Sequence, residues 1–337
     1  MEVSQMPVQT NDPGVVKQGR KFFSKLGLMY FLGTLIIIGI QLSVTVLIQV
    51  FAPSILENPN WSMVISMVPM YLIGMPIMIL LIRTVPKEKI EPKSISVGKL
   101  VLAMIMSYAI VYCSNLVGTV ITFIIGILKG SAVNNVIQDV VVNINPWLSV
   151  LFVVICAPIM EEIIFRKLLI DRAVRYGEGV AVFLSGLLFG LFHGNLSQFV
   201  YAFTLGLFFG LVYVKTGKII YSILLHMVVN FIGSVLSLFV LNLVDLDSLQ
   251  VILDGGDMAA MSTALPGLMA FAIYFICLIG VVIAGVVLLI VFRKKLRLSP
   301  RGIALPRGKR FTTTILNVGM GLFGIFWIVM IILQLIG

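Results

Sequence analysis

Charged residues are scarce in this sequence of 337 residues, and histidine occurs only twice. Charged side chains make up 11% of the chain, hydrophobic ones make up 60%, and the mean hydropathy is +1.12. A soluble globular domain does not need so much apolar surface, whereas long uncharged runs are typical of polytopic membrane proteins. The sequence therefore predicts an all-α protein, a polytopic transmembrane helical bundle.

Cysteine is also rare, and its placement excludes two kinds of site. Cys113, Cys156 and Cys277 all lie inside apolar runs. This position favours small buried side chains over a disulfide framework or a thiolate metal site. No cleavable signal peptide is expected, because the first 26 residues are polar and basic and the first apolar run is too long for a signal sequence.

The apolar runs define nine expected spans. They lie at about 27–51, 62–82, 100–128, 147–165, 180–194, 199–214, 219–244, 265–292 and 314–336. We find no soluble domain or long linker between them. The chain is therefore predicted to consist of a basic cytoplasmic segment, 1–26, and a single membrane domain, 27–337.

The linkers between these spans differ in charge. Every second linker is basic, and the others contain only Lys129 as a basic residue. The linker after the seventh span contains only acidic charges, at Asp245, Asp247, Asp254 and Asp257. The positive-inside rule then places the amino terminus in the cytoplasm and the carboxyl terminus outside. The net charge of +10 is thus explained by membrane topology and attraction to an anionic bilayer, and no nucleic-acid partner is expected. The absence of a long lumenal domain favours a bacterial plasma membrane.

Ionisable residues inside a span are costly, so they mark candidate functional sites. Five occur here: Glu161, Glu162 and Arg166 at the end of the fourth span, His193 at the end of the fifth, and His226 in the seventh. Glu162 and Arg166 are four residues apart, so on a helix they share a face and can pair. Glu161 points about 100° away, which leaves its carboxylate free for chemistry.

The spacing from the turns places three of these residues at one depth. Glu161 lies 16 residues before Gly177 and His193 lies 16 residues after it. After allowing for a charged protruding turn, both are expected about 14 Å below the cytoplasmic surface, and so is His226. The polar segment 194–198 must then lie beside a short span or a wet cavity, because irregular backbone at that depth needs water or protein partners.

Glycine and proline add two local expectations. Gly186, Gly190 and Gly194 repeat at intervals of four, as do Gly206 and Gly210, a pattern that favours close packing of helices over chemistry. Pro158 lacks a backbone donor, so we expect a kink near the carboxylates, with the carbonyl of Val154 left unbonded.

A glutamate, two histidines and an asparagine form a hydrolytic set. Glu161 can act as a general base toward water, the histidines can stabilise an oxyanion or bind zinc, and Asn230 can orient His226, four residues earlier, or donate to the oxyanion. A buried polar cluster that only joins helices is the alternative. The HExxH, GxSxG and GxxxxGK[ST] motifs are absent, so the usual zinc protease, serine hydrolase and phosphate-binding sites are not supported.

Three motifs, taken in order, resemble those of the CPBP intramembrane proteases. They are Glu161-Glu162-x-x-x-Arg166, Phe189-x-x-x-His193 and His226-x-x-x-Asn230. That family includes CAAX prenyl endopeptidases and bacterial Abi-type proteins linked to bacteriocin processing and self-immunity. The resemblance covers about 147–230 and implies a helical CPBP-like core at about 147–244, with its site open to the cytoplasm.

The resemblance also implies a role for each motif residue. Glu161 would activate water, with His193, His226 and Asn230 around it, and Glu162, Arg166 and Phe189 would support them. The expected substrate is a peptide or a membrane protein. The family is described both as metalloproteases and as metal-independent glutamate proteases, so His193 and His226 stand as possible ligands of zinc or another divalent metal, or of no metal. A non-catalytic membrane adaptor or bacteriocin-immunity protein with the same fold, bound to another membrane protein, is the second hypothesis.

Overall fold

A computed structural model describes residues 13–131, 133, 144–255, 258–299 and 302–336. No strand occurs among these residues, and the predicted all-α membrane bundle is confirmed. Eight helical segments are long and apolar enough to cross a membrane. The first twelve residues of the predicted segment 1–26, and Asp257, lie outside the described residues.

The eight segments match eight of the nine predicted spans. They are α1 (Pro13–Phe51), Pro59–Arg83 with α2 (Pro59–Pro69) and α3 (Met75–Arg83), α4 (Val97–Lys129), Pro146–Tyr176, α10 (Leu196–Thr216), Ile219–Leu241, α14 (Met258–Phe292) and α16 (Val318–Ile336). The predicted span 180–194 corresponds to α9 (Glu178–Phe192), which has only 15 residues. α9 stops early because Gly194 adopts a positive φ of 65° and Asn195 caps the next helix. Of the polar segment 194–198, only Gly194 and Asn195 lie in the turn after the short helix α9, and the other three residues begin α10.

Three of the spanning segments change helix type along their length. Pro59–Arg83 has the π-helical segment η2 (Met70–Gly74) between α2 and α3. Pro146–Tyr176 contains α6 (Pro146–Ser149), the π-helical segment η3 (Val150–Cys156), α7 (Ala157–Glu162), a second π-helical segment η4 (Ile163–Leu168), α8 (Leu169–Ala173) and η5 (Val174–Tyr176). Ile219–Leu241 contains α11 (Ile219–Asn230), the π-helical η6 (Phe231–Leu236) and α12 (Ser237–Leu241). The shorter helices α13 (Leu246–Leu253) and α15 (Arg310–Thr314) precede α14 and α16.

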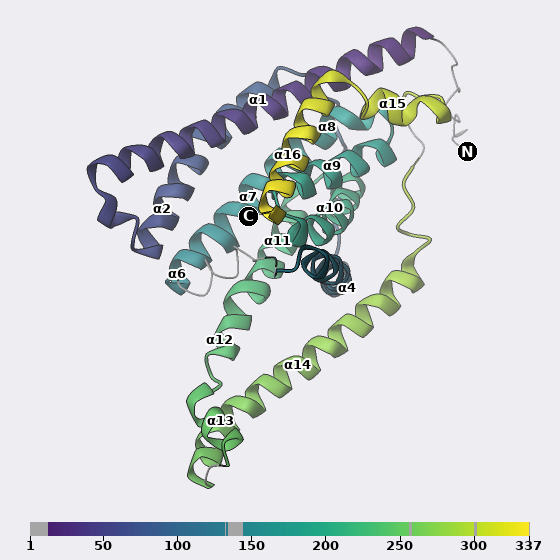
Figure 1. Ribbon diagram of the computed structural model, residues 1–337. Coiled ribbons are helices and arrows are strands. Elements are labelled where there is room, and N and C mark those ends of the chain that lie inside the picture. Colours follow the sequence, from purple (N-terminus) through teal and green to yellow (C-terminus); the bar gives the residue numbers. More distant parts are fainter. Residues whose placement is uncertain (1–12, 132, 134–143, 256–257, 300–301, 337) are drawn as a thin grey trace.

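The helices form two packed groups around the segment Pro146–Tyr176. α1 packs against α3, α15 and α16, and α4 lies between α10 and α14 (Figure 1). One hydrophobic core joins α1, α3, α8, α9 and α16, and a second joins α4, α10 and α11. The segments α7, α9 and α11, which contain the candidate site residues, meet between these two cores.

Glycines allow α9 and α10 to approach closely, as their spacing predicts. A Cβ on Gly206 would lie 2.9 Å from Cα of Gly186, and one on Gly186 would lie 2.9 Å from the carbonyl oxygen of Phe203. Gly190 also faces the backbone of α10. These positions therefore serve packing, and they fix the turn that contains His193.

Pro158 affects a carbonyl different from the expected one. In η3 the bonds join residues five apart, and the N–H of Ala157 donates to the carbonyl of Phe152. The next bond in that register would join residue 158 to Val153, but proline has no N–H to donate. The π-helical register thus leaves the carbonyl of Val153 without a helical donor, one residue before the expected Val154.

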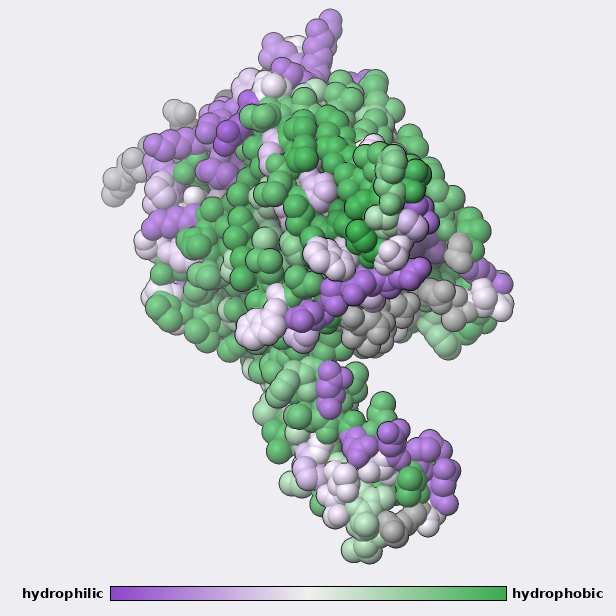
Figure 2. Space-filling model, turned by 90° about the vertical axis from the view of Figure 1, so that its left-hand side faces the viewer, coloured by the Kyte–Doolittle hydropathy of each residue, from purple (hydrophilic) through white to green (hydrophobic). Residues whose placement is uncertain are grey.

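The basic linkers gather at one end of the molecule. In the linker 84–96, the N–H of Lys93 donates to the carbonyl of Thr216, and Nζ of Lys218 donates to Oγ of Ser94. In the linker 293–309, the N–H of Ile303 donates to the carbonyl of Arg175. The acidic helix α13 lies at the opposite end from α8 and α15 (Figure 1). Figure 2 shows a broad apolar surface between two hydrophilic regions, as a membrane protein requires.

Candidate active site

Glu162 and Arg166 form a buried ion pair. Nε of Arg166 lies 3.2 Å from Oε2 of Glu162, and neither side chain has any exposed surface. The guanidinium also faces the rings of Phe189 at 4.3 Å and Phe209 at 5.7 Å. The four-residue spacing thus produces the expected pair, and aromatic faces surround the rest of its positive charge.

Glu162 also orients His226, which the sequence pattern did not indicate. Oε1 of Glu162 lies 3.0 Å from Nδ1 of His226. A carboxylate only accepts, so Nδ1–H of His226 is the donor. The ring is then fixed in one tautomer by the carboxylate, as in carboxylate–histidine pairs of hydrolases.

Glu161 lies on the other side of this imidazole. Its Oε2 is 3.7 Å from Nε2 of His226, and its side chain is 16% exposed while that of Glu162 is fully buried. The two adjacent carboxylates therefore have different environments. Both oxygens of Glu162 are occupied, one by the ion pair with Arg166 and one by the hydrogen bond from His226. The partly exposed carboxylate of Glu161 is the one that a substrate or water can reach.

His193 directly follows α9, and a backbone carbonyl of that helix holds its imidazole ring. Its Nδ1 lies 2.8 Å from the carbonyl oxygen of Phe189, so Nδ1–H donates and Nε2 is left for other partners. The Phe189 ring contacts His193 and His226 edge-on, with centroids 4.8 Å and 5.7 Å away. The ring of Phe189 thus joins the two histidines, and Glu161 reaches His226 from α7. The structure thus brings the three predicted ionisable residues from three helices together.

Asn230 links the site to the π-helical segment. Its Nδ2 donates to the carbonyl of Val153 at 2.9 Å, the acceptor that Pro158 leaves without a helical donor. Asn230 therefore ties α11 to η3, about two turns before Glu161. Its Oδ1 and its second amide hydrogen are available to other partners.

The two histidines have the chemistry of metal ligands, because each makes a hydrogen bond through Nδ1 and so leaves its Nε2 lone pair for a metal ion. However, no three His, Cys, Asp or Glu side chains within the described ranges are grouped closely enough to hold a metal ion. The present arrangement does not fit a zinc site. His193 and His226 as metal ligands stay a prediction, and we derive no step through a metal.

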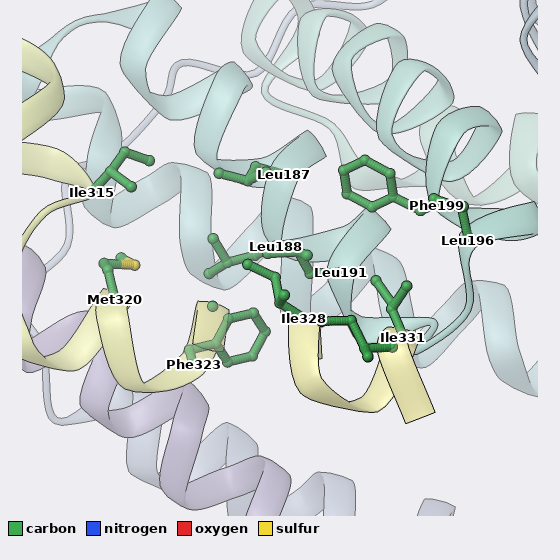
Figure 3. Close-up of a pocket in the computed structure, with 12 residues that line it drawn as sticks. Leu187, Leu188, Leu191, Leu196, Phe199, Ile315, Met320, Phe323, Ile328 and Ile331 are labelled. Carbon is green, nitrogen blue, oxygen red and sulfur yellow. The ribbon is translucent and has the colours of Figure 1, made fainter. Parts of the chain in front are cut away.

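An apolar cavity of about 380 Å³ lies beside the turn at His193. Figure 3 shows Leu187, Leu188 and Leu191 from α9, together with Leu196 and Phe199 from α10, facing Phe323, Ile328 and Ile331 from α16. None of the predicted catalytic residues lines this cavity. The cavity can hold a hydrocarbon group, but none of its lining side chains can act as an acid, a base or a nucleophile.

Together, the fold and the site define an all-helical, multi-pass membrane protein with a buried glutamate–histidine cluster. A family model described as type II CAAX prenyl endopeptidase Rce1-like matches residues 143–232. This match confirms the resemblance to the CPBP and CAAX protease family, over the segment that contains all three motifs. No curated protein and no solved structure matches the chain.

Proposed function

We propose that the protein is an intramembrane endopeptidase in which Glu161 activates a water molecule. The observation that carries this proposal is the arrangement around His226, which has one carboxylate fixed at Nδ1 and another, partly exposed, facing Nε2. A purely structural polar cluster does not require a second, accessible carboxylate at that imidazole. The matched family also supports a peptide-bond hydrolase.

The proposed reaction balances within these side chains. Glu161 takes a proton from water as the water oxygen bonds to the scissile carbonyl carbon. Nδ1–H of His226 donates a hydrogen bond to Glu162, which holds the ring beside Glu161, and the second amide hydrogen of Asn230 can donate to the developing oxyanion. Nε2 of His193 accepts the second hydrogen of the water and orients it. Glu161 then returns its proton to the leaving nitrogen as the carbon–nitrogen bond breaks.

We further propose a substrate with an apolar part. The cavity beside the His193 turn is lined by hydrocarbon side chains, so it suits an apolar peptide segment or a lipid-modified one. The matched family is named for prenylated peptides. We therefore propose an apolar peptide or membrane protein as the substrate, at a bacterial plasma membrane, with the amino terminus in the cytoplasm.

The test compares wild-type protein with Glu161→Gln in proteoliposomes. Two probes are used: a farnesylated peptide that ends in a CAAX sequence, and a peptide library prepared from a bacterial proteome, with new amino termini identified by mass spectrometry. We expect cleavage by the wild type that Glu161→Gln lowers at least a hundredfold. Cleavage that is independent of Glu161 would contradict the role proposed for this carboxylate. No cleavage of either probe would contradict the proposed activity and favour the membrane adaptor.

The two histidines give a second check in the same assay. His193→Ala and His226→Ala should each lower cleavage at least about a hundredfold, the scale for losing an oxyanion donor or a proton-transfer group. Asn317→Ala is a matched control, since Asn317 is a buried polar residue at the start of α16 and away from the cluster. Near-normal turnover in either histidine variant would remove that histidine from the mechanism.

A further inference from the structure

His193 lies at the end of a helix, in a turn that contains a glycine. It follows the last residue of α9, and the next residue, Gly194, has no side chain and a positive φ of 65°. The backbone N–H groups of His193 and Gly194 donate to carbonyls three residues earlier, those of Gly190 and Leu191, as in the tightened last turn of a helix. Helix ends of this kind open readily unless another element packs against them.

The indole ring of Trp327, in α16, packs against this turn. A Cβ on Gly194 would lie 3.0 Å from Cζ3 and 3.3 Å from Cε3 of the indole, so the ring lies directly on the glycine backbone. The centroid of the Phe192 ring is 5.1 Å from that of Trp327. The indole is nearly buried, with 8% of Trp327 exposed. Trp327 therefore contacts the residues on both sides of His193.

The space beside this contact is not filled. The apolar cavity of about 380 Å³ is lined by Leu191, before the turn, and by Leu196, after it (Figure 3). A void withholds the van der Waals contacts that a close-packed core would give these side chains. Because Leu191 and Leu196 are loosely packed on the side of the cavity, the indole ring is well placed to hold the backbone between them.

We propose that Trp327 is a positioning residue for His193. The indole ring holds the turn, and the turn sets the direction in which the imidazole leaves the backbone. The imidazole then keeps its hydrogen bond to the carbonyl of Phe189 and its edge-on contact with the Phe189 ring, which also contacts His226. Trp327 lies outside the matched segment 143–232 and outside the three motifs. Only the kinetic consequence below rests on the proposed function.

The first experiment needs no substrate, because the chain has only two histidines. NMR of protein labelled with nitrogen-15 histidine, in detergent, observes the imidazole nitrogens of both, and His193→Ala and His226→Ala assign the signals. In a neutral imidazole held in one tautomer, one nitrogen carries the proton and the other is bare, so their signals lie far apart. Exchange between the tautomers brings the two signals together.

Trp327→Leu should release the imidazole of His193 and leave that of His226 in place. At about pH 8, where an ordinary histidine is neutral, we expect the two His193 signals to move together or to broaden. The signals of His226 should stay at their wild-type positions, since Glu162 holds that ring. Unchanged His193 signals would overturn the proposal, and so would an equal change at both histidines.

Two further variants control for ring size and for loosening of α16. Trp327→Phe keeps a smaller ring and should change the His193 signals less than Trp327→Leu does. Phe31→Leu removes a ring of α1 that packs on Phe326 of α16, with centroids 6.1 Å apart, and should leave both histidines as in the wild type. The same change in Phe31→Leu as in Trp327→Leu would overturn the proposal. If Trp327→Leu does not accumulate in the membrane, unchanged His193 signals in Trp327→Phe overturn it.

The kinetic consequence is measured with the probe that the wild type cleaves. Trp327→Leu should lower kcat about tenfold to a hundredfold, the scale for a misplaced catalytic group, with KM within about twofold of the wild type. In the His193→Ala background, Trp327→Leu should slow cleavage no further, because the imidazole that it positions is gone. Multiplied effects would overturn the role. Unchanged His193 signals overturn the inference even if Glu161 proves essential, and the expected change supports it even if no peptide is cleaved.

Discussion

Arg166 shows how a full positive charge is accommodated where water is scarce. Its side chain is fully buried, and Nε lies beside one carboxylate, that of Glu162. Nη1 and Nη2 make no hydrogen bond to the part of the chain that the structure describes, but two aromatic faces lie against the guanidinium. A delocalised, weakly hydrated cation suits such a site, and the ammonium of lysine does not.

Removing Arg166 should therefore harm stability as much as activity. Arg166→Ala leaves Glu162 as a buried carboxylate that keeps the hydrogen bond from His226 but has lost its cation, which costs about 3–5 kcal/mol of folding stability. The double variant Glu162→Gln with Arg166→Met removes both charges and should accumulate and melt closer to the wild type. The measurements are membrane accumulation and the melting temperature in detergent. A single variant that melts like the wild type would show that the two residues do not depend on each other.

At the scale of the elements, the π-helical segment η3 determines which backbone carbonyl Asn230 contacts. The Val153 carbonyl is left without a helical donor at Pro158, and Asn230 from α11 supplies the missing hydrogen bond. Asn230 is thus required by the local backbone, whatever it does to a substrate. Replacing Asn230 should therefore lower the folding stability, and this loss can be measured separately from any loss of catalysis.

Pro158→Ala should reduce the structural need for Asn230. Asn230→Leu in the natural background leaves a carbonyl unsatisfied and should cost about 1–3 kcal/mol. In the Pro158→Ala background, the new N–H can bond to Val153, so the same replacement should cost less than half as much. Thermal unfolding of the four proteins in a double-mutant cycle measures this. Equal costs in both backgrounds would refute the link between Pro158 and Asn230.

The pair α9 and α10 offers a second test of packing. Gly206→Ala places a methyl 2.9 Å from Cα of Gly186 and 3.1 Å from the Phe189 ring. We expect a loss of about 1–3 kcal/mol from overpacking, and lower activity because His193 lies at the end of α9. Gly210→Ala is the control, since its methyl meets Ile170 at 3.4 Å, an ordinary contact. Equal stability and activity of the two variants would contradict this account.

The sequence predicted contacts within one helix better than contacts between helices. The pair Glu162–Arg166 follows from spacing along one helix, because four residues make about one turn. The glycine repeats predicted only that helices pack closely. The contact of Glu162 with His226 depends on how α11 is rotated, and no spacing within a helix determines that rotation. The unmatched carbonyl of Val153 was not expected either, because a π-helical segment changes the register that α-helical spacing assumes. The end of α9 could have been recognised from Gly194 and the capping residue Asn195.

At the scale of the whole molecule, basic and acidic residues are separated between the two ends of the helical bundle. Linkers 84–96 and 293–309 meet the turns at Arg175 and Thr216, and Glu178 joins them by pairing with Lys215 at 3.3 Å. The acidic residues of α13 lie at the other end. Segments far apart in sequence thus form one basic end, which the positive-inside rule assigns to the cytoplasm.

Cysteine labelling tests this orientation in intact bacterial cells. In a background without Cys113, Cys156 and Cys277, single cysteines replace the exposed residues Lys89, Lys309 and Asp247, one at a time. A membrane-impermeant maleimide should label Asp247→Cys in intact cells, and Lys89→Cys and Lys309→Cys only after lysis. The reverse pattern would invert the predicted topology, and labelling of all three from one side would refute it. Because Lys89 and Lys309 lie at the same end, they must behave alike in either orientation, so each serves as a control for the other.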